Sequence, residues 1–122
     1  MSDPLFDEVI RQVLSELSPD LKEALESVQI VVQPKPSAEQ LENGDQKPDD
    51  DLLGLFEGLS LKDQPVGEDR LFPDRIILFE ESLKDACSSR KELALEIRKT
   101  LLHELGHFFG FDEDELKRRG YE

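Results

Sequence analysis

The hydrophobic residues of the first segment recur at helical spacing. Asp3-Pro4 is typical of an N-cap followed by proline at the first helical position. The apolar positions that follow are three or four residues apart: Leu5, Phe6, Val9, Ile10, Val13, Leu14 and Leu17. This pattern predicts an amphipathic helix that packs against the rest of the protein. Ser18-Pro19 repeats the start signal and predicts a second, short helix over residues 21–27.

Three later segments have the character of β-strands. The stretch VQIVVQ (Val28–Gln33) alternates apolar and polar residues, LLGLFEG (Leu52–Gly58) is apolar with two glycines, and DRIILFE (Asp74–Glu80) is a third apolar run. The glycines of the second stretch suggest close backbone approach or a bulge. Residues 34–51 combine prolines, Asn43-Gly44 and a run of acids, and we predict a long loop there.

The C-terminal third is predicted to be helical. Ser82 is a candidate cap for a short helical turn, and Ser89-x-x-Glu92 is a capping box placed before a long helical pattern. That pattern predicts a helix over Arg90–Phe109, which Gly110 ends in the left-handed conformation. The order of helices, then strands, then helices predicts an α+β domain rather than a doubly wound sheet.

The length, apolar runs, cysteine content and net charge of the chain limit the kinds of protein that it can be. A chain of 122 residues and 14.0 kDa is expected to form one domain, residues 1–122. No run of 18 apolar residues occurs, and the N-terminus lacks the pattern of a secretory signal. The single Cys87 cannot form an internal disulfide and suits a reducing cytoplasm. A net charge of −14 repels phosphate backbones and anionic membranes, so neither nucleic acid nor a membrane is expected as a partner.

Both histidines of the chain fall in the stretch HELGHFFGFDEDE, which begins at His103. On a helical wheel His103 and His107 lie about 40° apart, away from the apolar arc. The apolar arc holds Ile97, Leu101, Leu105 and Phe108, extended by Ala94, Leu102 and Phe109, whereas the neighbours of the histidines are Glu92, Glu96, Lys99 and Thr100. Two interpretations compete: a pair of surface histidines, or a metal site. The H-E-x-x-H spacing favours the metal site.

The chemistry of a zinc hydrolase requires this spacing. Residues i and i+4 of a helix lie one turn apart, so two imidazole nitrogens can meet one zinc ion at about 2.0–2.1 Å. Glu104 lies one step around the helix, outside the first coordination shell. Zinc lowers the pKa of a bound water toward about 7, and Glu104 would accept the proton as general base while the oxygen attacks a polarised carbonyl.

A third protein ligand is expected close behind the helix. Twelve residues follow Gly110, too few for a distant glutamate on another downstream helix, and the only methionine is Met1, which excludes families with a methionine turn. The acidic cluster 112–115 remains. Glu113 has the favoured offset, with Asp112 as the alternative. The same acids suit the first turn of a final helix, so Asp112 could cap while Glu113 binds the metal.

The sequence resembles the mini-zincins, a family of minimal zincin-like metallopeptidases among small bacterial proteins with the pattern H-E-x-x-H-x-x-G-x-x-D. The similarity extends over nearly the whole chain and is most specific in IRKTLLHELGHFFGFDEDEL; it also includes SPDLKEALESVQIVV, LLGLFEG, PDRIILFEESL and the terminal RGY. The resemblance implies a small twisted sheet of about three strands packed on N-terminal helices and a metal-bearing helix, with bound zinc. It implies His103, His107 and Glu113 as ligands and Glu104 as the catalytic acid/base. This chain has glutamate at 113 where aspartate is commoner, and the extra methylene could shift the carboxylate or make it bidentate.

The resemblance also implies a peptide or protein substrate. In zincins the strand that borders the active helix binds extended substrate by edge pairing, and the candidates here are LLGLFEG and DRIILFE. Tyr121 could donate a hydrogen bond to an oxyanion, although packing of its ring on the core is the favoured interpretation. We therefore expect a zinc-dependent metallopeptidase. The alternative is a metal-binding adaptor or regulatory protein that retains the fold without turnover. A ribonuclease with three histidines is disfavoured by the two histidines and the acidic charge.

Overall fold

The computed structural model describes residues 3–43, 52–58 and 74–119. Within these ranges three strands form one mixed sheet in the order β1-β3-β2. The strands are β1 (Val28–Gln33), β2 (Gly54–Glu57) and β3 (Asp74–Phe79). The central strand β3 pairs in parallel with β1 and antiparallel with β2. The predicted α+β class with a three-stranded sheet is confirmed.

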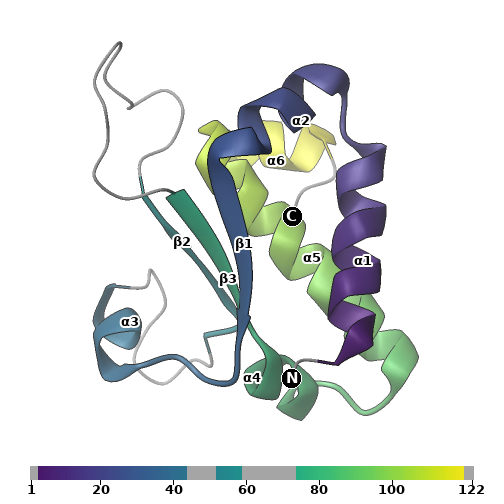
Figure 1. Cartoon of the computed structure of the whole chain (residues 1–122), viewed down its shortest axis with the longest axis vertical. Coiled ribbons are helices and arrows are strands. Elements are labelled where there is room, and N and C mark those ends of the chain that lie inside the picture. The colour runs from purple at the N-terminus through teal and green to yellow at the C-terminus, as the bar shows by residue number, and fades with distance from the viewer. Residues whose placement is uncertain (1–2, 44–51, 59–73, 120–122) are drawn as a thin grey trace.

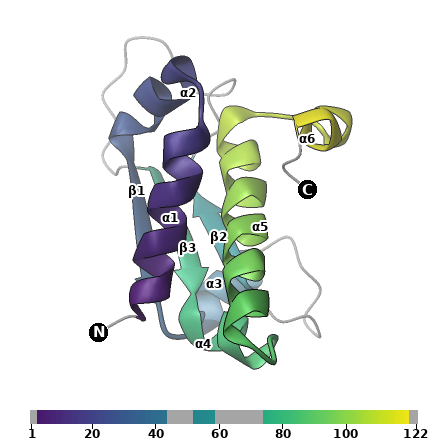
Figure 2. The same cartoon turned by 90° about the vertical axis from the view of Figure 1, so that its right-hand side faces the viewer.

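Two long helices cover one face of this sheet. The helices are α1 (Pro4–Glu16), α2 (Pro19–Ala24), α3 (Ala38–Asn43), α4 (Glu80–Asp85), α5 (Arg90–Phe109) and α6 (Glu113–Arg119), with a 3₁₀ turn at Leu25–Ser27. Figures 1 and 2 show α1 and α5 side by side against the sheet, and α6 at the C-terminal end of α5. No helix within the described ranges is both long enough and apolar enough to cross a bilayer.

The main core lies between the sheet and these two helices. Its fully buried members include Phe6, Val13, Ile76, Leu78, Leu83, Ile97, Leu101, Leu105 and Phe108. A smaller buried cluster on the opposite side of the sheet contains Leu52, Leu55, Ile77 and Phe79. Because side chains alternate along a strand, the central strand β3 supplies residues to both clusters, which explains its unbroken apolar run.

Local capping explains where several helices begin. Asp3 accepts a hydrogen bond from the Leu5 amide at 3.0 Å, and Ser18 caps α2 in the same way. The Ser89 hydroxyl accepts from the Glu92 amide at 3.1 Å, so the predicted start of α5 is confirmed. The reciprocal half of the capping box is displaced by one residue. The Glu92 carboxylate accepts from the amide and hydroxyl of Ser88 instead of from the Ser89 amide.

Two predictions about local structure were wrong. Part of the predicted loop 34–51 is the helix α3, which begins with a complete capping box: the Gln40 amide donates to the Ser37 hydroxyl at 3.1 Å, and the Ser37 amide donates to the Gln40 side chain at 2.8 Å. Residues 44–51 of that predicted loop lie outside the described ranges. Ser82 does not cap a helix. Helix α4 follows β3 directly, begins at Glu80 without a side-chain cap, and contains Ser82 in its interior.

The predicted strand Leu52–Gly58 is shorter than expected, and its glycines have the predicted role. Only Gly54–Glu57 pairs with β3. Gly58 has a φ of 140°, and a Cβ atom there would overlap the Asp74 carboxylate. At Gly54 a Cβ atom would lie 2.6 Å from Cγ2 of Thr100 on α5. Both glycines therefore mark close approach of the backbone to a neighbouring element.

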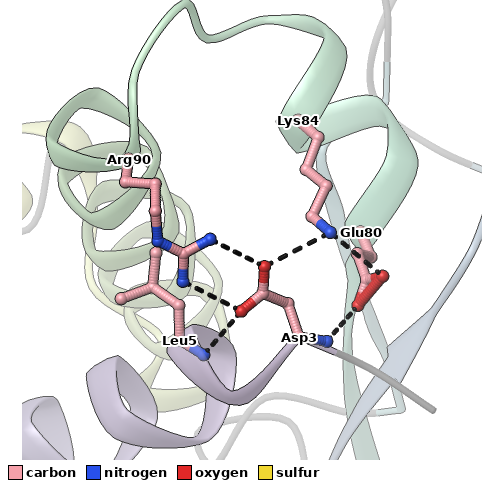
Figure 3. A network of polar contacts seen from close by, with 5 residues as sticks. All are labelled: Asp3, Leu5, Glu80, Lys84 and Arg90. Carbon is pink, nitrogen blue, oxygen red and sulfur yellow. Dashed lines mark hydrogen bonds and ion pairs between the residues drawn. The ribbon is translucent and has the colours of Figure 1, made fainter.

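A network of charges holds the N-terminal residues to α4 and α5 (Figure 3). The Arg90 guanidinium donates two hydrogen bonds to the Asp3 carboxylate at 3.0 and 3.1 Å, and the Lys84 ammonium lies 3.3 Å from it. The Asp3 amide donates to the Glu80 carboxylate at 2.8 Å. The hydrogen bonds from Arg90, then that from the Leu5 amide, hold the pKa of Asp3 well below its usual range.

This network predicts a pH-dependent contribution to stability. Because the folded-state pKa of Asp3 is lowered, its ionised form stabilises the fold at neutral pH, and the contribution declines as the pH falls below about 4, the pKa of an aspartate in the unfolded chain. Asp3→Asn keeps a capping side chain and loses the charge. We expect it to be less stable than the wild type at pH 7, with the difference shrinking below about pH 4 in urea unfolding.

The matched control is Glu16→Gln, which removes a more exposed ion pair with Arg98. It should change the free energy of unfolding less, since exposed pairs contribute little. A stability difference between Asp3→Asn and wild type that is independent of pH between 2 and 7 would contradict the assignment.

Candidate metal centre

One face of helix α5 lies in the core, and the opposite face carries the candidate metal site. The predicted core arc of Ile97, Leu101, Leu105 and Phe108 is fully buried. His103 and His107 lie on the other side and are half-buried. Thr100 was predicted to lie on the same side of the helix, and it lines the groove with His103, but it is buried at 9% exposed. Strand β2 packs over this part of the helix, and Gly54 comes directly against the Thr100 methyl group.

The two imidazoles converge as the spacing predicted. Their Nε2 atoms are 3.0 Å apart, and their ring planes lie at 86° to each other. Two nitrogens bound to one tetrahedral zinc ion at about 2.0–2.1 Å would be about 3.3 Å apart. The spacing of the ring nitrogens is therefore close to that of two ligands of one metal ion.

Glu104 adds a carboxylate to this pair. One oxygen of Glu104 and one nitrogen from each of His103 and His107 all lie within 4.8 Å of one another, and all three side chains are half-buried. Among the residues that the structure describes, this is the one group of three such side chains able to hold a metal ion. The two imidazole nitrogens are ligands that suit zinc, and the Glu104 carboxylate lies beside them.

A groove of about 230 Å³ lies between β2 and α5, beside His103 and Glu104. It is lined by Leu53, Gly54, Glu96, Lys99, Thr100, His103 and Glu104. One wall is thus the backbone of a strand, and the other is the polar face of the metal-site helix. Sequence reasoning placed Thr100, Glu96 and Lys99 on the histidine side of α5. Leu53 and Gly54 belong to LLGLFEG, one of the two strands predicted as candidates to border the metal-bearing helix; the pairing that decides between the candidates is remote in sequence.

The chain reverses at the end of α5 in the way predicted. Gly110 has a φ of 79°, its amide donates to the His107 carbonyl at 3.1 Å, and the Phe111 amide donates to the Gly106 carbonyl at 3.0 Å. These two bonds form a Schellman motif. Phe111 then packs against Phe109 with ring centroids 5.4 Å apart. Helix α6 then begins at Glu113, three residues after Gly110.

The acidic segment begins α6. The Glu115 amide donates to the Asp112 carboxylate at 2.8 Å, so Asp112 caps this helix as predicted. Leu116 anchors α6 in the core at 2% exposure. Glu113 is the first residue of α6, but its side chain lies outside the described part of the structure, as does all of Tyr121. The ligand role of Glu113 stays a prediction.

Cys87 is the only thiol in the chain and the other side chain that zinc would favour. Burial raises the pKa of the Cys87 thiol, and the carboxylates of Glu92 and Glu96 raise it further. A thiol that stays protonated at neutral pH is a poor metal ligand, because the thiolate is the form that binds.

Comparisons with known proteins agree with this geometry. The fold is similar to the solved structure of a conserved hypothetical protein from Thermo thermophilus, with a TM-score of 0.52 and 21% sequence identity over 93% of this chain and 95% of that one. No curated protein matches the sequence significantly. The family model of zincin-like metallopeptidases matches residues 25–121, which include strand β2 beside the groove and the whole H-E-x-x-H helix. The resemblance seen in the sequence is confirmed, and the chain belongs to the zincin-like metallopeptidase family.

Proposed function

We propose that this protein is a zinc-dependent metallopeptidase in which Glu104 acts as general base. The observation that carries the proposal is the convergence of two imidazole nitrogens and one carboxylate, with His103 and Glu104 in the lining of a groove beside β2. Family membership supports a peptidase at the level of the family.

Three side chains of this chain would hold the metal. His103 and His107 would bind through their converging Nε2 atoms, and we propose Glu113 as the third ligand because α6 begins there, directly after the Gly110 turn. Zinc bound at this position supplies Lewis acidity, which polarises a carbonyl group and lowers the pKa of water.

Glu104 would move the protons of the reaction. Its carboxylate takes a proton from water as the water oxygen attacks the carbonyl carbon of the scissile peptide. It then delivers that proton to the amide nitrogen, so that the C–N bond breaks and the products are a carboxylic acid and a free amine. The helix places Glu104 one residue after His103, beside the metal ligands and facing the groove. The same residue can thus serve as base and then as acid.

Strand β2 would bind the substrate. Of the two candidate strands, β3 is central and paired on both sides, whereas β2 pairs with β3 alone within the described sheet. An extended peptide could therefore add to β2 as a further strand. The peptide would run along the groove that contains His103 and Glu104. We propose peptides or proteins of the cytoplasm as substrates, and the net charge of −14 disfavours nucleic acids and anionic membranes.

Metal binding should stabilise the folded protein. A ligand that binds only the native state at 100 times its Kd adds about 2.7 kcal/mol to the free energy of unfolding. We expect zinc to raise the Tm of the wild type and a chelator to reverse the change. His103→Asn and His107→Asn should abolish the response, whereas Glu104→Gln should retain it. An equal zinc-dependent shift in His103→Asn would place the metal elsewhere.

Glu104→Gln should abolish peptide hydrolysis while leaving zinc bound. Loss of a general acid–base group lowers the rate by roughly 10²–10⁴-fold. Cleavage of a quenched fluorescent peptide library by the zinc-loaded protein provides the measurement. The matched control is Glu92→Gln, the same change on the same helix at an exposed position outside the groove.

Equal rates for Glu104→Gln and wild type would refute the base assignment. No cleavage by either protein with zinc bound would favour the alternative of an adaptor or regulator that retains the fold. In that case a partner captured by the wild type should also bind Glu104→Gln.

The third ligand can be tested with neighbouring substitutions. Glu113→Gln should weaken zinc binding by more than about 100-fold, because loss of an outer-shell partner alone costs about 10–100-fold. Asp112→Asn keeps a capping side chain for α6 and should leave zinc affinity close to that of the wild type. Competition with a chromophoric chelator measures both. The reverse order of affinities would assign Asp112 as the ligand.

A further inference from the structure

The two walls of the groove come close together at Gly54. A Cβ atom at this position would lie 2.6 Å from Cγ2 of Thr100, 3.2 Å from the carbonyl oxygen of Ile77 and 3.4 Å from Cγ of Glu104. The first distance is too short for any side chain, so even alanine would force β2 and α5 apart or displace Thr100. Gly54 is buried, and its absent side chain is what allows this contact.

The atoms around Gly54 connect it to the proposed general base. Thr100 and Glu104 are four residues apart on α5, so their side chains lie on adjacent turns of the same face. A methyl group at Gly54 would collide with Thr100 and would be in van der Waals contact with Glu104, and all three residues line the groove. None of its three nearest atoms belongs to His103 or His107. A side chain added at Gly54 should therefore displace Glu104 more than it displaces the two histidines.

The other side of Gly54 is held by the sheet. Gly54 pairs with Leu78, which is fully buried on the central strand, and Phe56 on the same face packs edge-on against Phe108 of α5 at 5.7 Å between ring centroids. The backbone of β2 is thus fixed from both sides. The Thr100 methyl group lies next to this backbone. A side chain added at Gly54 would therefore push against Thr100, because β2 itself is held in place.

We infer that Gly54 is a positioning residue for Glu104, because its missing side chain sets the spacing between β2 and the turn of α5 that carries Thr100 and Glu104. This inference rests on the proposed function and extends it. In this inference, Gly54 on the proposed substrate-binding strand determines the direction in which the Glu104 carboxylate points. The peptide bound along β2 and the base that acts on it are then held in register by direct contact between strand and helix.

A double-mutant cycle tests the inference. The four proteins are wild type, Gly54→Ala, Thr100→Ser and the double variant, all loaded with zinc. Thr100→Ser removes only Cγ2, the atom with which the alanine would collide. We expect Gly54→Ala to lower kcat/KM by about 100-fold, the scale associated with a misplacement of 1 Å, with unchanged zinc affinity. The double variant should recover at least about tenfold of this loss, but not all of it, because the carbonyl of Ile77 still crowds the new methyl group.

Two further readouts separate positioning from a general loss of stability. The rates are measured at a temperature where every variant is fully folded, and crystal structures of the zinc-loaded variants locate the Glu104 carboxylate. A displaced carboxylate in Gly54→Ala that returns in the double variant supports the inference even if the wild type proves to cleave no peptide. Gly54→Ala alone could fail to fold. In that case a double variant that folds and has the wild-type position of the Glu104 carboxylate supports the inference in the same way.

Two results would overturn the inference while leaving the proposed function intact. One is wild-type kcat/KM and an unmoved Glu104 carboxylate in Gly54→Ala. The other is a folded double variant that recovers neither the activity nor the carboxylate position. A fall in zinc affinity that parallels the fall in rate would instead assign the effect to the histidines and would likewise overturn it.

Discussion

Two imidazoles one helical turn apart can keep a fixed direction relative to the rest of the site only if the helix that carries them is held against rotation. In this protein the opposite face of α5 supplies that restraint, with Ile97, Leu101, Leu105 and Phe108 fully buried against the sheet and α1. Burial of each such side chain is worth about 1.5–3 kcal/mol, and close packing resists small displacements. Helical spacing brings His103 and His107 together, and the core on the other side of the same helix fixes the direction in which the pair points.

Two further segments adjoin α5, and we propose that one supplies the substrate-binding strand and the other the third ligand. Strand β2 approaches along the polar face and comes into contact where Gly54 has no side chain. The C-terminal segment returns through the left-handed Gly110, and Leu116 fixes α6 in the core. Neither arrangement requires a metal ion, because apolar burial and backbone hydrogen bonds hold both. The scaffold is thus prepared to receive a metal, which reduces the ordering that binding must supply.

Local physics made much of this structure predictable. Helix α5 begins and ends at the predicted residues because Ser89 and Gly110 act on their immediate neighbours, and the histidine pair follows from helical spacing alone. The burial of Thr100 was missed because the strand that covers it is 46 positions away in sequence, and the identity of β2 as the edge strand depends on the same long-range pairing. Helix α3 was not predicted for a different reason. Its capping box at Ser37 is present in the sequence, but the surrounding prolines are typical of a loop.

The central claim is that one metal ion is bound by two adjacent imidazoles and a carboxylate, and X-ray absorption at the zinc edge of the loaded protein tests it most directly. The account predicts a shell of nitrogen and oxygen neighbours at about 2.0–2.2 Å, with the multiple-scattering signature of two imidazoles and no sulfur. A sulfur neighbour at about 2.3 Å, which Cys87 would supply, or a spectrum with no imidazole contribution would contradict it.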